Sequence, residues 1–245
     1  MPQPLPPTSP APCAGIPHAV LPTAHGPLPL QGLTLLLVED SRFSSDAMRL
    51  ICQRAGARLR RAECLQSARA HLRLYRPDVV IIDLGLPDGR GEDLIRQVLL
   101  SSRRPALILG TSGSAGGRAA ALAAGADGDL DKPITSFSQF CTLLRQHFKL
   151  ADQPMPYPAD TPIQPDPLAL QDDLAQAAAA LHNHPDAAQR RYLGGFLLGL
   201  ARMAQDAPLA DASLTLFGSL ENSSITNLIE TRLAQGPQAF VRLKD

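Results

Sequence analysis

The sequence predicts an α/β domain built on a parallel sheet, followed by a smaller all-helical domain. Two observations lead to this fold class. Up to about residue 150, short runs of aliphatic residues alternate with polar segments, as is typical of buried parallel strands and their connections. Beyond a second cluster of prolines, the apolar residues recur with helical spacing instead.

Each predicted strand is followed by residues that carry a charge or a hydroxyl group. In chain order the strands are 33–38 before Glu39 and Asp40, 79–82 before Asp83, 106–110 before Thr111 and Ser112, and a weaker strand at 127–130 shortly before Lys132. The carboxyl ends of parallel strands meet at one edge of a sheet, where ligands bind in open α/β folds. We therefore expect three carboxylates, a hydroxyl and an amine to converge there.

This convergence predicts a metal site. Unit charges about 4 Å apart repel by roughly 4 kcal/mol at an effective dielectric constant near 20. A hard divalent cation offsets the repulsion, and an all-oxygen set of ligands suits Mg²⁺. A magnesium ion beside a carboxylate, with a hydroxyl and a lysine opposite, is arranged for phosphoryl transfer. Asp83 would be the carboxylate nucleophile.

Residues 33–148 resemble the receiver domain of two-component response regulators. The resemblance rests on the acidic pair, the segments 82–89 (IDLGLPDG) and 124–128 (AGADG), and the Lys-Pro pair at 132–133, which occur in the family's order. It implies a five-stranded, parallel, doubly wound (flavodoxin-like) sheet with helices on both faces. It also implies a cis peptide bond before the proline.

The resemblance assigns a role to each site residue. Asp83 would be the phosphoacceptor, and Glu39, Asp40, Asp83 and the backbone carbonyl of Gly85 would bind Mg²⁺. Lys132 would be the family's conserved lysine. The implied chemistry is autocatalysed phosphotransfer and dephosphorylation of the chain itself, so we do not expect a conventional enzyme.

The sequence departs from the family pattern at two positions. Counted back from the lysine, the family's hydroxyl position falls on Gly110, so a shorter loop must bring Thr111 or Ser112 into its place. We favour Ser112, because the Ser-Gly pair that begins there resembles the family's Ser-Gly or Thr-Ala pair. Asp129 stands where many relatives carry an aromatic residue whose rotation reports phosphorylation. The route from this site to an output surface is therefore expected to differ.

Proline clusters divide the chain into four predicted parts. Residues 1–30 contain ten of the 23 prolines and no Asp, Glu, Lys or Arg, so we expect a disordered arm. This segment lacks the basic start and the apolar core of a secretory signal. Residues 31–150 would be the receiver domain, 151–166 a proline-rich linker, and 167–245 a helical domain for output or dimerisation.

Four helices are expected in the last part. They begin at Asp166–Pro167, at Pro185, near Leu209 and near Ile225. Proline in the first turn and an Asp at the N-cap are typical helix starts. The second helix carries an apolar stripe that has the spacing of one helix face: Tyr192, Phe196, Leu200 and Met203.

Charge argues against a nucleic-acid-binding output. Residues 151–245 contain six Arg and Lys against eleven Asp and Glu, whereas residues 31–150 contain seventeen against twelve. Modules that bind nucleic acid normally carry net positive charge, because neutralising phosphates supplies much of their affinity. We therefore expect the helical domain to act through contacts with a protein partner.

The combined expectation is a response regulator of a two-component phosphorelay. A sensor histidine kinase or a histidine phosphotransfer protein would phosphorylate Asp83, and this would switch the helical domain, with a homodimer as one option. The four cysteines show no CxxC or framework spacing, which fits reduced thiols in a cytoplasmic protein, and no apolar run is long enough for a membrane span.

Other functions remain open at this point. A receiver-like interaction scaffold that is never phosphorylated, and a DNA-binding transcriptional regulator, are the alternatives. A phosphatase that uses Asp83 as nucleophile fits less well, because Gly85 stands where such enzymes usually place a second acid.

Overall fold

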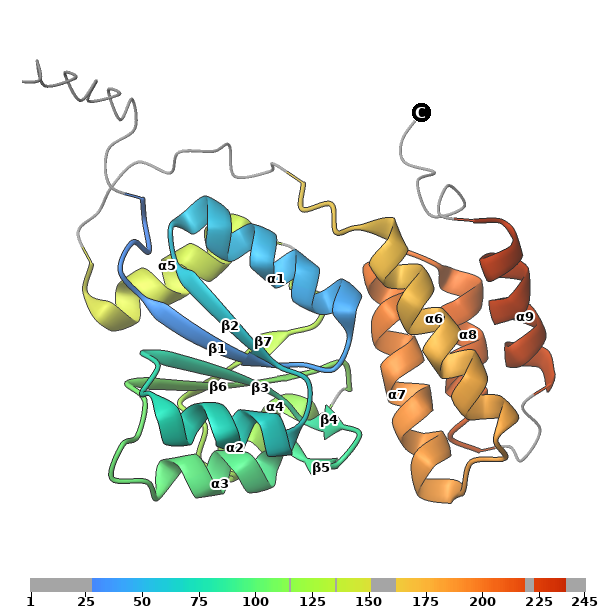
Figure 1. The fold of residues 1–245 in the computed structure, drawn as a ribbon, viewed down its shortest axis with the longest axis horizontal. Helices are drawn as coiled ribbons and strands as arrows, with labels where there is room; N and C mark the ends of the chain where they lie inside the picture. Colours follow the sequence, from blue (N-terminus) through green and yellow to red (C-terminus); the bar gives the residue numbers. More distant parts are fainter. Residues whose placement is uncertain (1–27, 115, 135, 151–161, 219–222, 237–245) are drawn as a thin grey trace, which may run out of the picture.

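The computed structural model describes residues 28–114, 116–134, 136–150, 162–218 and 223–236. It contains the predicted five-stranded sheet, with helices on both faces, and a bundle of helices beside one end of the sheet (Figure 1). The strands are β1 (Thr34–Val38), β2 (Arg58–Ala62), β3 (Val79–Asp83), β6 (Leu107–Ser112) and β7 (Gly128–Asp131). They are all parallel, in the order β2-β1-β3-β6-β7, which confirms the flavodoxin-like arrangement.

Helices cover the two faces of the sheet in two groups. The first group is α1 (Arg42–Ala55) and α5 (Phe137–Phe148), and the second is α2 (Leu65–Leu74), α3 (Gly91–Leu99) and α4 (Gly117–Ala123). The central strand β3 is buried along its whole length, because its aliphatic residues contact both helical layers. A short hairpin, β4 (Gly85–Leu86) and β5 (Gly89–Arg90), follows β3 at the carboxyl edge.

The receiver domain begins earlier than predicted. Leu30 was assigned to the arm at residues 1–30, but its side chain is fully buried in the core and its N–H donates to the carbonyl of Ala55, at 2.8 Å. The predicted linker shows a similar difference, because Ile163 packs against the same core. The rest of the predicted arm (1–27) and of the linker (151–161) lies outside the described residues.

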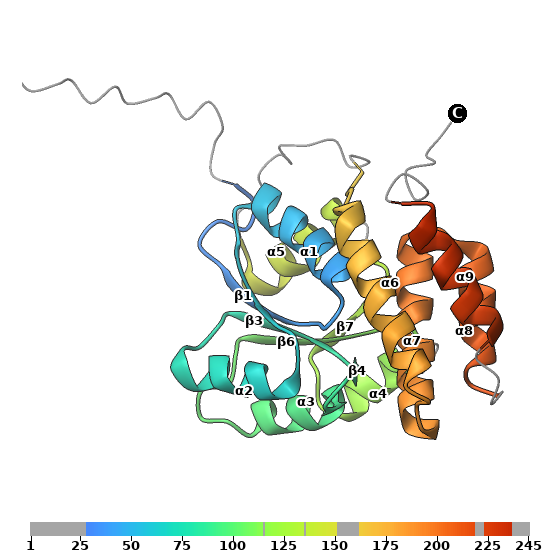
Figure 2. The same ribbon diagram turned by 45° about the vertical axis from the view of Figure 1, so that its right-hand side comes forward.

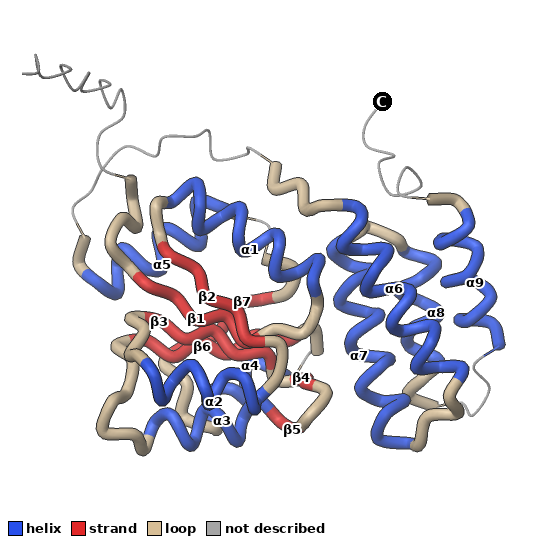
Figure 3. The backbone as a smooth tube through the Cα atoms, in the orientation of Figure 1, coloured by secondary structure: helices blue, strands red, loops and turns tan. Residues whose placement is uncertain are grey.

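The C-terminal region is helical, as predicted. Its helices are α6 (Pro167–His182), α7 (Ala187–Met203), α8 (Ala207–Thr215) and α9 (Ser223–Ala234) (Figure 3). The Asp166 carboxylate caps α6 by accepting from the N–H of Leu168, so this helix start is confirmed. The start predicted at Pro185 is wrong by two residues, because Asp186 and Gln189 form a capping box that begins α7 at Ala187.

The four residues of the apolar stripe on α7 are not equally buried. Leu193, Leu197 and Leu200 are buried in the bundle, together with residues of the other three helices. Tyr192 and Phe196 are only half-buried, and they line a cavity on the side of α7 that faces the receiver. Part of the predicted stripe therefore lies at the boundary between the two domains.

The bundle lies against the edge of the sheet at which the strands end. Helix α6 packs along α1, and α7 contacts β4 and the start of α1. The same arrangement is visible after rotation of the view (Figure 2). The helical domain thus covers the edge at which the sequence places the functional residues.

A close contact under Asp83 generates the first prediction. A Cβ atom added at Gly91, the first residue of α3, would lie 2.1 Å from the backbone oxygen of Asp83. We expect Gly91→Ala to lower the free energy of unfolding by about 1–3 kcal/mol, because the backbone must shift to admit the methyl group. Urea denaturation followed by circular dichroism measures this.

Gly195→Ala is the matched control. This glycine lies inside α7, and a Cβ atom there has no described heavy atom within 4 Å. Because alanine favours a helix over glycine by up to about 1 kcal/mol, the control should be neutral or stabilising. Equal urea midpoints for Gly91→Ala and the unmodified protein would contradict the prediction.

Candidate functional site

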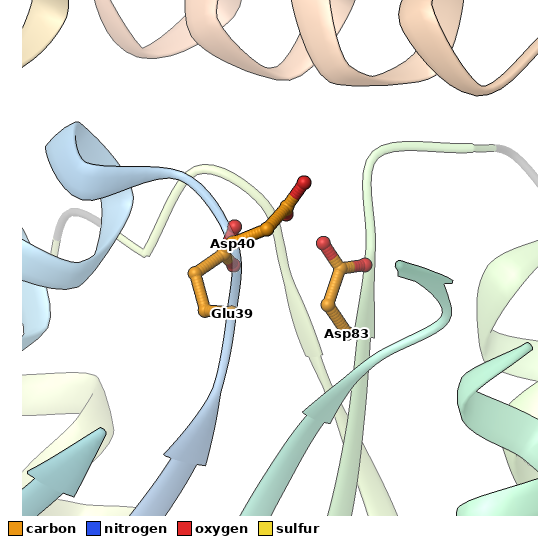
Figure 4. Close-up of side chains that lie close together, drawn as sticks. All are labelled: Glu39, Asp40 and Asp83. Atoms are coloured by element: carbon orange, nitrogen blue, oxygen red, sulfur yellow. The ribbon is translucent and has the colours of Figure 1, made fainter. Parts of the chain in front are cut away.

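The register of β1 and β3 brings the three predicted acids together. Val38, the last residue of β1, lies beside Ile82 of β3, so the two acids that follow β1 meet Asp83, the last residue of β3, at the same edge. Carboxylate oxygens of Glu39, Asp40 and Asp83 lie within 4.8 Å of one another. Figure 4 shows the side chains of Asp40 and Asp83 rising from this edge toward the helices of the C-terminal domain.

Lys132 lies between two of these acids. Its ammonium nitrogen Nζ is 2.5 Å from Oδ2 of Asp83 and 2.6 Å from Oε2 of Glu39. The Lys132–Pro133 peptide bond is cis, as predicted. Burial alone would lower the pKa of Lys132, but the charges of Asp83 and Glu39 raise it above its usual range. The lysine therefore stays protonated and offsets part of the negative charge.

The acids that follow β1 are strongly affected by burial. Burial raises the pKa of Glu39 to about 8, although the charge of Lys132 opposes the shift. Burial likewise raises the pKa of Asp40 to about 6, and a hydrogen bond from Tyr192 opposes that shift. Both carboxylates are thus less stable as anions than they would be in water, because burial removes their hydration.

Asp40 has one oxygen with a hydrogen-bond partner and one without. Its Oδ2 accepts a hydrogen bond from the Tyr192 hydroxyl. Its Oδ1 is buried and has no hydrogen-bond partner among the described residues. A buried carboxylate oxygen without a partner is costly. Because all three acids offer oxygen ligands, this donor set fits a hard cation such as Mg²⁺.

The two candidate hydroxyls lie close to Asp83 but differ in access. Thr111 pairs with Asp83 across β3 and β6, and its hydroxyl is buried without a hydrogen-bond partner among the described residues. Ser112 lines the cavity in front of Asp83 and contacts Ser114, with 3.0 Å between their hydroxyl oxygens. Gly85 lies near them, and its N–H donates to Oδ1 of Asp83 at 3.1 Å.

The acid at the usual aromatic position has a partner of its own. Asp129 lies in β7 and forms an ion pair with Arg118 of α4, at 3.6 Å. Its side chain is mostly buried. An aspartate that is ion-paired in this way has no ring that could turn inward.

A cavity of about 580 Å³ lies between the site and the helical domain. The receiver contributes Glu39, Asp83, Ser112 and Lys132 to its wall, and α7 contributes Arg191, Tyr192, Gly195, Phe196 and Gly199, among others. A space of this size can admit a small phosphorylated molecule to Asp83, since ligand sites typically measure about 300–1,000 Å³.

Sequence reasoning missed two residues of the second domain that contact this site. The first is Tyr192, for which the sequence indicated only a place on an apolar helix face. The second is Asp173 of α6, which is almost fully buried. Its carboxylate accepts hydrogen bonds from the hydroxyl of Ser41 at 2.8 Å and from the N–H groups of Arg42 and Phe43, both at 3.0 Å. The signal that could have revealed it is an acid beside Leu174, on a helix face that is otherwise apolar.

Fold and site together define a class of α/β domain with an acidic pocket at the carboxyl edge of a parallel sheet. Residues 35–145 match the family model of the response regulator receiver domain. This part of the chain is therefore a receiver domain of the two-component response regulators.

Relatives support this assignment over the receiver region. The KDP operon transcriptional regulatory protein KdpE of Escherichia coli K12 is 37% identical over 100 residues, which cover 41% of this chain and 44% of KdpE. The transcriptional regulatory protein PhoP of the same strain is 32% identical over 130 residues, or 51% of this chain and 58% of PhoP. The chain thus spans about half the length of the curated relatives it matches.

Among solved structures, the receiver domain of the sensor histidine kinase PA1611 from Pseudomonas aeruginosa PAO1 is similar. It was solved with a magnesium ion in its active site cleft. It is 22% identical, covers 48% of this chain and 98% of its own, and has a TM-score of 0.45.

In the part of this chain that the structure describes, no helix is both long and apolar enough to cross a membrane.

The raised pKa of Asp40 generates the second prediction. Burial raises the pKa of Asp40 from its ordinary value of 3.8 to about 6, so the unfolded chain loses this proton at a lower pH than the folded protein does. Above about pH 6 the buried, ionised carboxylate therefore lowers the free energy of unfolding. We expect Asp40→Asn to raise the free energy of unfolding by about 1–3 kcal/mol at pH 7.5 with EDTA present. The gain should shrink as the pH falls through 6 toward 4. Urea denaturation across this range measures it.

Asp93→Asn serves as the control for this measurement. Asp93 lies on the exposed face of α3, where its partner Arg96 is also exposed, so no pH-dependent gain is expected. A loss of stability in Asp40→Asn at pH 7.5 would show that the carboxylate is net stabilising where it lies.

Proposed function

We propose that this protein is a cytoplasmic response regulator that accepts a phosphoryl group on Asp83 from a sensor histidine kinase or a histidine phosphotransfer protein. The observation that carries the proposal is the buried cluster of Glu39, Asp40, Asp83 and Lys132 at the carboxyl edge of a receiver fold. Three acids and one amine leave an excess of negative charge, which suits a site that takes up a cation before it reacts.

Magnesium is the proposed cofactor. Glu39, Asp40, Asp83 and the carbonyl of Gly85 would hold it, and when bound it would neutralise charge on the oxygens of the transferred group. The unpartnered Oδ1 of Asp40 supports this assignment, because a bound cation would satisfy it.

Side chains of the site would have separate roles in phosphoryl transfer. A carboxylate oxygen of Asp83 attacks the phosphorus, the bond from phosphorus to the donor's nitrogen or oxygen breaks, and an acyl phosphate forms. The ammonium group of Lys132 would move from the carboxylates to an oxygen of the new phosphoryl group. The hydroxyl of Ser112, or of Thr111, would bind another. In this proposal the chain is a phosphoacceptor, and it does not turn over a separate substrate.

For the output, we favour contact with a protein partner over contact with DNA. The acidic excess in residues 151–245 supports this choice. The names of KdpE and PhoP favour the alternative, a transcriptional regulator, although the matched residues cover only about half of each. Retention on a DNA column that falls steeply with salt would support that alternative.

The third prediction tests the phosphoacceptor. We expect the full chain, incubated with acetyl phosphate and Mg²⁺, to gain a single phosphoryl group in its intact mass. Asp83→Asn should gain none, because the amide lacks the nucleophilic oxygen. Omission of Mg²⁺ should lower the yield at least tenfold, since the charge on the site would then be uncompensated.

Asp88→Asn is the matched control for this experiment. Asp88 lies five residues along the same loop, but its carboxylate accepts from the N–H groups of Leu65 and Gln66 and does not line the cavity. This variant should take up phosphate normally. If the unmodified protein gains no adduct and binds no Mg²⁺, the scaffold alternative is the better account.

A further inference from the structure

The Tyr192 hydroxyl contacts the candidate metal site from the other domain. It lies on α7, 152 residues along the chain from Asp40, and donates a hydrogen bond to Oδ2 of that carboxylate. The remaining oxygen, Oδ1, is buried and has no hydrogen-bond partner within the described residues. One oxygen of Asp40 is therefore fixed by the helical domain, and the other is left for a ligand.

The docked bundle leaves room for that ligand. The cavity between α7 and the receiver still reaches Glu39, Asp83 and Lys132. Among the described hydrogen bonds and ion pairs, Tyr192 is the α7 side chain that contacts an acid of the cluster. Its contact is to Oδ2, so docking leaves the other oxygen of Asp40, Oδ1, for a cation.

A second contact holds the same stretch of backbone. Asp173 accepts from Ser41, Arg42 and Phe43, the three residues that directly follow Asp40. Ser41 in turn donates its N–H to Oε1 of Glu39, at 3.3 Å. The helical domain thus restrains the acidic pair through its backbone as well as through the side chain of Asp40.

We propose that Tyr192 is a positioning residue for the metal-binding carboxylate of Asp40, so that cation binding and docking of the helical domain strengthen each other. The proposal rests on the proposed function, since it concerns the same Mg²⁺ site. Outer partners that orient metal ligands commonly change metal affinity by about 10–100-fold when they are removed. By thermodynamic linkage, if docking raises the affinity for the cation, then cation binding must stabilise the docked state by the same free energy.

Titration calorimetry of the full chain with MgCl₂ tests the first half of the proposal. Tyr192→Phe removes one oxygen and keeps the ring, so we expect Mg²⁺ affinity to fall about tenfold. Tyr75→Phe is the matched control: its hydroxyl contacts His71 on α2, away from the site, and its loss should leave the affinity unchanged. An unchanged or higher affinity in Tyr192→Phe would overturn the proposal, and a higher one would mean that the hydroxyl competes with the cation.

Hydrogen exchange of α7 tests the reciprocal half. Added Mg²⁺ should slow exchange in the peptides of α7 in the unmodified protein, and should do so much less in Tyr192→Phe. Equal slowing in both proteins would show that the hydroxyl does not couple the two events.

A third variant separates positioning from general packing. Asp173→Ala should weaken docking, because it leaves the N–H groups at the start of α1 without their acceptor. Tyr192→Phe should then cost little further Mg²⁺ affinity in that background. The control Asp172→Ala removes a solvent-exposed ion pair with Arg42 across the same interface, which should contribute little to docking. Fully additive losses would contradict a shared mechanism.

Mg²⁺ binding by the unmodified protein and by Tyr192→Phe separates the role of Tyr192 from the proposed function. If the unmodified protein binds no Mg²⁺, the proposed metal site itself fails. If it binds Mg²⁺ and Tyr192→Phe binds it equally well, the metal site stands and the role of Tyr192 is overturned.

Discussion

The excess of negative charge at the carboxyl edge of the sheet is the constraint to which the rest of the structure responds. Three carboxylates within 4.8 Å of one another repel strongly, by roughly 4 kcal/mol for a pair about 4 Å apart at moderate dielectric constant. Lys132 offsets this for Glu39 and Asp83. Asp40 forms no ion pair among the described residues, and it accepts a hydrogen bond from a hydroxyl of the helical domain. Distant segments of the chain thus meet at this edge and stabilise its acids.

The same edge explains why the helical domain docks where it does. Helix α1 begins directly after the acidic pair, and its first N–H groups carry the positive end of the helix dipole. The carboxylate of Asp173 accepts from these groups, so a buried acid of one domain caps a helix of the other. Because a buried charge without partners is costly, this contact favours one docked geometry over others. The site and the interface therefore share residues 40 to 43.

The sequence was sufficient to predict the group of site residues within the receiver domain, but it was not sufficient to predict the contacts between the two domains. Glu39, Asp83 and Lys132 each follow a strand, and parallel strands bring their ends together whatever else the chain does. Tyr192 and Phe196 have helical spacing, but spacing alone does not say which apolar stripe meets the bundle and which meets another domain. Leu30 was missed because a proline-rich composition obscured a single core residue. Contacts between domains depend on orientation, which local periodicity does not encode.

The position of Asp129 bears on how a change at Asp83 reaches the helical domain. Asp129 is held in an ion pair with Arg118 and has no ring that could turn inward. A signal through β7 therefore lacks the aromatic side chain that would carry it. The cavity, in contrast, places Arg191, Tyr192 and Phe196 of α7 across from Asp83. A phosphoryl group would replace the single negative charge of the Asp83 carboxylate with up to about two, and would add three acceptor oxygens on the receiver side of this cavity. Its field would reach α7 across the cavity, beside the direct contacts of Tyr192 with Asp40 and of Asp173 with Ser41, so the two domains are linked at this edge both by contact and through the cavity.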